Sequence, residues 1–85
     1  MDCFVYKSVR KNDTYIFLRD EEGFDVLPAP LAEQLGELAF VIALQLSPER
    51  KLAREDVNVV MRNLHEQGFH LQLPLPDDSF MMGPS

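Results

Sequence analysis

The chain has 85 residues, a formal net charge of −6 and a single cysteine, Cys3. This length suits one domain and is too short for two separate cores, and a hydrophobic fraction of 46% argues against disorder over most of it. The acidic balance disfavours nucleic acid and anionic lipid as partners, and no apolar run reaches the length of a membrane span. Because there is one cysteine and no leader-like start, we expect a cytoplasmic protein without membrane contact.

The first part of the chain predicts a β-hairpin. Residues 2–8 (DCFVYKS) and 14–20 (TYIFLRD) are rich in β-formers, and a polar stretch, VRKND, joins them. Apolar side chains on both faces of each strand indicate a sheet that is covered on both sides, at least in part. The acidic stretch 20–25 (DEEGFD) lacks the alternating ligand spacing of a calcium loop, so we interpret it as a solvated turn.

A short helix and an apolar strand follow. In the stretch PAPLAEQLG, proline in the first turn and Gly36 after the last turn are typical of a helix with these ends. Residues 37–46 (ELAFVIALQL) are the most apolar in the chain and predict a strand buried on both faces, although periodicity alone does not exclude a buried helix. Pro48 ends this segment.

The clearest helix spans residues 54–67 and is followed by the last strand, residues 69–73. Apolar residues of the helix recur at helical spacing, and Gly68 ends it. In the strand, alternation predicts that Phe69, Leu71 and Leu73 face inward and that His70 and Gln72 face outward. The segment after Pro76 is expected to be a flexible tail.

Together these elements predict an α/β (α+β) sandwich, with a mainly antiparallel sheet of about four strands and helices packed on it. The expected order is strand, strand, helix, strand, helix, strand. We assign residues 1–76 to a single domain and residues 77–85 to a short, flexible C-terminal tail.

No pattern in the sequence indicates catalysis, a cofactor or a metal. His65 and His70 are five residues apart across a helix-to-strand junction, which is not the spacing of a helical histidine pair. Cys3 lies in a predicted strand and is interpreted as a small buried side chain, and the four glycines are isolated. An enzyme whose site joins Cys3, a histidine and an acid is kept as an alternative.

The favoured hypothesis is a small, non-catalytic module that binds an unknown protein partner. The final strand and its proline-rich exit are the expected contact surface, because an edge strand can add a partner strand. The candidate surface residues are Tyr6, Tyr15, His70, Gln72, Pro74, Leu75 and Pro76. The alternative is an RNA or nucleotide binder that uses the two tyrosines and a basic patch, which consists of Lys7, Arg10, Lys11, Arg50 and Lys51.

Several of these stretches occur together in one known family. The segments CFVYKS, TYIFL, VLP, LQLSPERKLAREDV and LHEQGFHLQLPLP follow one another from Cys3 to about Pro76, and the last is the most specific. In order and spacing they resemble the YcgL domain family of gammaproteobacteria. The resemblance implies a compact α/β domain with an antiparallel sheet and helices packed on it, and it brings no catalytic or cofactor-binding position.

Overall fold

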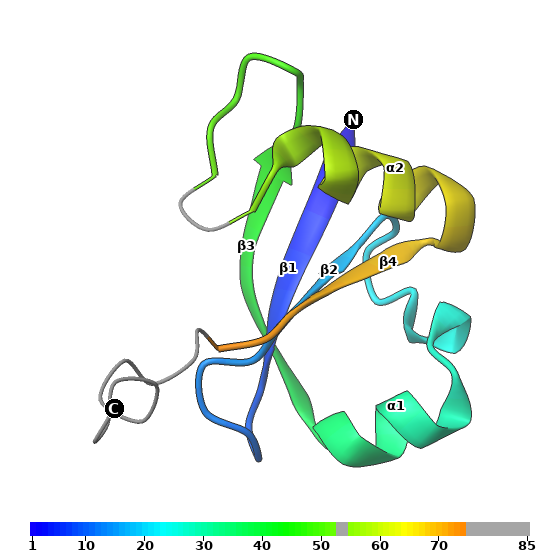
Figure 1. Cartoon of the computed structure of the whole chain (residues 1–85). Coiled ribbons are helices and arrows are strands. Elements are labelled where there is room, and N and C mark those ends of the chain that lie inside the picture. The colour runs from blue at the N-terminus through cyan, green and yellow to red at the C-terminus, as the bar shows by residue number, and fades with distance from the viewer. Residues whose placement is uncertain (53–54, 75–85) are drawn as a thin grey trace, which may run out of the picture.

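The computed structural model describes residues 1–52 and 55–74 and contains four strands and two α-helices. Figure 1 shows the elements in chain order: β1 (Asp2–Ser8), β2 (Tyr15–Leu18), the 3₁₀ turn η1 (Phe24–Val26), α1 (Ala29–Leu35), β3 (Leu38–Gln45), α2 (Val57–Gln67) and β4 (Phe69–Gln72). The strand and helix order confirms the order predicted from the sequence. The expected tail, residues 77–85, lies outside the described residues.

The four strands form one antiparallel sheet in the order β3-β1-β2-β4. β1 pairs with both β2 and β3, and β4 pairs with β2, so β3 and β4 are the two edge strands. In the central hairpin, Val5 lies opposite Phe17 and Tyr6 opposite Ile16. The predicted α+β fold with a four-stranded antiparallel sheet is therefore confirmed.

The helices cover opposite faces of the sheet and divide the core in two. On the α2 face, the buried side chains of Val57, Val60 and Leu64 pack with Cys3 and other strand residues. On the α1 face, Leu31 and Leu35 of the short helix belong to the cluster around Tyr6, Ile16 and Leu18. Figure 1 shows α2 lying across the sheet near the N-terminal end of β1. Both faces of the central strands are buried, as their two-sided apolar pattern predicted.

Local signals set the ends of both helices. α1 has proline in its first turn and ends at Gly36, as predicted. α2 begins at Val57, three residues later than predicted, because Asp56 acts as the N-cap and its carboxylate accepts a hydrogen bond from the backbone N–H of Asn58 at 2.9 Å. Gly68 ends α2 in the left-handed region, with φ of 88°.

One prediction about the sheet is wrong. β3 is a strand, as expected, but it is not buried on both faces: Phe40, Val41 and Ile42 are 55%, 45% and 48% exposed. The physical reason is the strand order, which places β1 in the centre and leaves β3 at the edge with a free long side. An apolar run predicts a strand but does not say where in the sheet that strand lies.

Within residues 1–52 and 55–74, none of the helices has the length and apolar character that crossing a bilayer requires.

Candidate functional site

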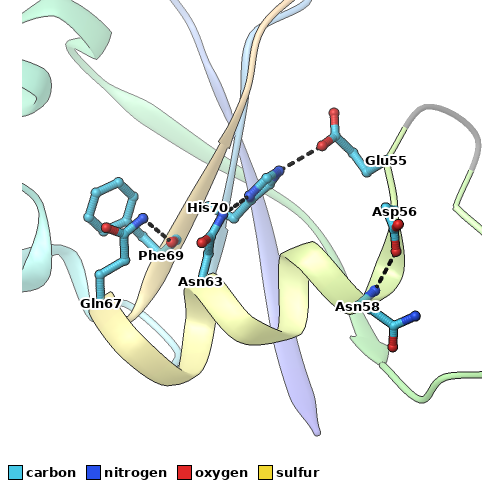
Figure 2. A network of polar contacts seen from close by, with 7 residues as sticks. All are labelled: Glu55, Asp56, Asn58, Asn63, Gln67, Phe69 and His70. Atoms are coloured by element: carbon cyan, nitrogen blue, oxygen red, sulfur yellow. Dashed lines mark hydrogen bonds and ion pairs between the residues drawn. The ribbon is translucent and has the colours of Figure 1, made fainter.

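Two of the segments that carry the family resemblance meet on the α2 face of the sheet. One leads from the end of β3 to the start of α2, and the other contains the end of α2 and the whole of β4. A hydrogen bond joins them, because Nε2 of His70 on β4 lies 2.7 Å from Oε1 of Glu55, just before α2 (Figure 2). This junction joins the connection before α2 to the last strand of the sheet.

His70 is held from three sides. Its Nδ1 lies 2.8 Å from the amide nitrogen of Asn63 on α2, and its ring packs edge-on against Phe17 with centroids 5.7 Å apart. An amide nitrogen only donates, so Nδ1 accepts and the proton sits on Nε2, which donates to Glu55. Figure 2 shows the ring between these two partners. Both ring nitrogens are therefore occupied, and neither is free to bind a metal or to take a proton from a substrate.

The position of His70 corrects a prediction. The strand alternation placed it outward with Gln72, but its residue is only 8% exposed. The reason is that both faces of β4 are partly covered: α2 covers the face that His70 occupies, and Phe69 and Leu71 pack against the α1-face cluster. His70 is thus a positioning residue that fixes the chain before α2 against β4. The prediction that Leu73 faces inward is also wrong: β4 ends at Gln72, and Leu73 is 61% exposed.

An apolar hollow lies on the same face. It has a volume of about 190 Å³ and is lined by Val5, Tyr15, Phe17, Ile42, Leu44, Leu52 and Gln72. Residues from all four strands contribute, and Leu52 comes from the segment that precedes Glu55. The hollow therefore extends from the β3 edge toward β4.

The β3 edge beside this hollow is apolar on both faces because of a β-bulge. Val5 of β1 pairs with Ile42, but the next residue, Tyr6, pairs with Phe40, so Val41 is an extra residue. Phe40 consequently lies on the α1 face, where its ring contacts Tyr6 edge-on at 5.5 Å, while Ile42 lies on the α2 face at the hollow. No residue of β3 carries a charge. We refer to Phe40, Val41 and Ile42 as the β3 edge patch.

A second hollow, of about 370 Å³, lies at the turn between β1 and β2. It is lined by Lys7, Ser8, Val9, Asn12, Asp13 and Tyr15. Ser8 is already engaged there, since its hydroxyl donates to the carbonyl of Leu35 at 2.6 Å and accepts from the N–H of Lys11 at 3.0 Å. This hollow is larger than the apolar one, but its serine hydroxyl serves the fold and is not free for a ligand.

Apart from His70, the predicted surface residues divide into three groups. Tyr15 and Gln72 line the apolar hollow, and Pro74 is exposed. Tyr6, in contrast, is 4% exposed, and its hydroxyl accepts a hydrogen bond from the N–H of Glu22, so it is interior and not a stacking surface. Leu75 and Pro76 lie outside the described residues.

The predicted basic patch is not brought together. Lys7, Arg10 and Lys11 lie at the C-terminal end of β1, and the guanidinium of Arg10 donates to the carbonyl of Glu33 at 3.0 Å. Arg50 and Lys51 follow β3, whose last residue pairs with Asp2 at the opposite end of β1. The two basic groups therefore come from connections that leave opposite ends of β1, and no hydrogen bond or hollow of the described residues joins them.

Cys3, the candidate nucleophile of the enzyme hypothesis, is withdrawn from solvent. Cys3 is fully buried, and burial raises the pKa of its thiol from 9.0 to about 12. Across residues 1–52 and 55–74, no three His, Cys, Asp or Glu side chains cluster as metal ligands would.

Sequence reasoning missed two features of this region, the His70–Glu55 junction and the exposed edge of β3. The junction joins residues 15 positions apart through a loop whose path no local pattern defines. For the edge, the only signal was the absence of charge from β3, which is equally typical of a buried strand.

Comparison with known proteins places the whole described domain in one family. The sequence model of the YcgL domain matches residues 3–75. A YcgL domain-containing protein of Thioalkalivibrio sulfidiphilus is 50% identical over 74 residues, which cover 87% of this chain and 91% of the relative. Similar proteins of Pseudomonas entomophila and Pseudomonas putida are 46% and 44% identical over 79 residues, or 93% of this chain and 81% of each relative. The chain belongs to the YcgL domain family.

Proposed function

We propose that this protein is a small, non-catalytic, cytoplasmic interaction module that binds an extended segment of a protein partner along the edge of β3. The observation that supports the proposal is the β3 edge patch, in which three large apolar side chains are about half exposed on an uncharged eight-residue strand. A free strand edge offers backbone donors and acceptors for an added strand, and neighbouring side chains give specificity. The apolar hollow beside Ile42 offers a place for one partner side chain.

The other sheet edge, which the sequence favoured, is a weaker candidate. β4 has only four residues, and the carbonyl of Phe69 already accepts a hydrogen bond from the side chain of Gln67 at 3.1 Å (Figure 2). Short edge strands and occupied backbone groups are ways in which proteins discourage strand addition. β3 is twice as long as β4 and carries neither lysine nor proline.

Nucleic-acid binding finds less support. Stacking needs exposed aromatic rings, and Tyr6 is buried. A phosphate backbone needs clustered positive charge, and the two basic groups belong to different connections of a chain of net charge −6.

Photo-crosslinking in the native cell tests the proposal. A benzophenone amino acid is placed at Val41 on the β3 edge, at Leu73 beyond β4, or at Arg62 on the exposed side of α2. We expect discrete protein adducts from position 41 and fewer from positions 73 and 62. Adding Ile42→Lys, which puts a charge into the patch, should remove the adducts of position 41.

A matched substitution distinguishes the two edges. Leu73→Lys adds the same charge at an apolar residue that is 61% exposed, so it changes surface chemistry equally but on the other side of the sheet. The adducts of position 41 should survive Leu73→Lys. If they survive Ile42→Lys as well, or if all three positions crosslink alike, β3 is not the binding edge.

A further inference from the structure

The β3 edge has a property that the proposed function does not require: it is complementary to itself. We infer that the segment bound along β3 is β3 of a second copy of this chain, in an antiparallel pair about a two-fold axis. This inference rests on the proposed function, because it names the partner at the same edge.

The bulge at Val41 allows such a pair to span the whole strand. Before the bulge, Leu38 and Phe40 lie on the α1 face because they pair with Ser8 and Tyr6; after it, Ala43 and Gln45 lie on that face because they pair with Phe4 and Asp2. Residues on one face are therefore even-numbered in the first half and odd-numbered in the second.

A two-fold axis perpendicular to the sheet keeps each face on its own side, so paired residues must share a face. In a regular strand this demands partners of equal parity. In β3 the bulge changes this rule, so that an even-numbered residue of one copy must pair with an odd-numbered residue of the other. A register that spans the whole strand then pairs the first half of one copy with the second half of the other. Phe40 then lies opposite Ala43, Ala39 opposite Leu44 and Leu38 opposite Gln45, with the axis between Val41 and Ile42.

Side-chain size and charge suit this register. On the α1 face the large ring of Phe40 meets the methyl group of Ala43, and on the α2 face Leu44 meets Ala39, so large residues face small ones in both pairs. Beside the axis, the β-branched Val41 of each copy lies opposite Ile42 of the other. No residue of β3 is charged, and no like charges are brought opposite each other within the pair. This matters because each copy carries a net charge of −6.

The same geometry sets the expected strength. A single strand edge falls at the small end of protein interfaces, below about 1,200 Å² in total, so we expect a dissociation constant between about 1 μM and 1 mM. The two acidic copies repel at long range, so the dimer should become tighter as salt screens that repulsion.

Sedimentation of the full chain over this concentration range tests for the dimer, and disulfide formation tests the register. The double variant Phe40→Cys, Ala43→Cys should give a covalent dimer under mild oxidation. Each single variant should not, because equal positions lie on opposite sides of the axis. Cys3 is buried and protonated, so the unmodified chain serves as the silent control.

The outcomes separate the two proposals. A concentration-dependent dimer that Ile42→Lys abolishes, with crosslinking confined to the double variant, supports the inference. A monomer at every concentration, a dimer that survives Ile42→Lys, or single variants that crosslink as well as the double variant would overturn it. In the monomer case, position-41 photo-adducts to another protein would preserve the proposed function, and their absence would remove that too.

Discussion

Removing the carboxylate of Glu55 should destabilise the protein far more than its place before a helix suggests. The Glu55→Ala variant loses the 2.7 Å hydrogen bond to His70 Nε2 and leaves that N–H without an acceptor in a residue that is 8% exposed. A hydrogen bond to a charged partner contributes about 1.5–3 kcal/mol to stability, so we expect the free energy of unfolding to fall by about 2 kcal/mol. For a domain of this size that lowers Tm by about 10 °C.

Urea unfolding followed by circular dichroism measures this difference. The control is Glu49→Ala, which removes the same side chain from an exposed position in the same connection and should have little effect. Glu55→Gln separates charge from hydrogen bonding, because the amide oxygen can still accept from Nε2, and it should retain a large part of the stability. Amide exchange in β4 and the first turn of α2 should accelerate in Glu55→Ala. If Glu55→Ala costs no more than Glu49→Ala, His70 does not hold the chain before α2 as described.

Two further changes test the packing around the site. Gly68→Ala should lower the free energy of unfolding by about 1–2 kcal/mol, because Gly68 has φ of 88° and a Cβ there would lie 3.1 Å from Val26 Cγ1. Adding Val26→Ala should recover only the part of this loss that is due to the close contact. Full recovery of stability would contradict the argument from backbone conformation. Stability should also fall above pH 9, because the thiol of Cys3 ionises there in the unfolded chain, whereas burial raises its pKa to about 12 in the folded protein. The free energy of unfolding should decrease by about 1.4 kcal/mol for each pH unit between 9 and 12. The alkaline slope should be correspondingly smaller in Cys3→Ala, and an unchanged slope would show that other groups cause it.

Local sequence signals predicted the helices and the strands well. Gly68 predicted the end of α2, and the spacing of Val57, Val60 and Leu64 predicted its buried face, through interactions confined to a few neighbouring residues. The start of α2 was predicted three residues too early, because Asp56 was assigned to the first turn and is the N-cap. Such features depend on nearby residues only, so a single sequence contains them.

The arrangement of the strands was not predictable in the same way. β1 pairs with β3 across 30 to 43 residues, and the apolar run of β3 does not indicate how many strands lie beside it. The candidate site also depends on contacts between distant elements. Alternation within β4 predicted that His70 faces solvent, but α2 covers that face of the strand. Tyr6 is likewise buried by the cluster on the α1 face. The exposure of the β3 edge patch follows from the strand order, which the sequence does not indicate.

The bulge in β3 also bears on how this chain can tolerate a change of length. Losing one residue inside a strand normally turns every later side chain to the opposite face. Loss of Val41 would leave the later side chains on their present faces, because Phe40 and Ile42 already pair with the consecutive residues Tyr6 and Val5. Deletion of Val41 would join two segments that keep their partners and their faces, so we expect β3 to tolerate the loss of this residue better than the loss of a neighbouring one.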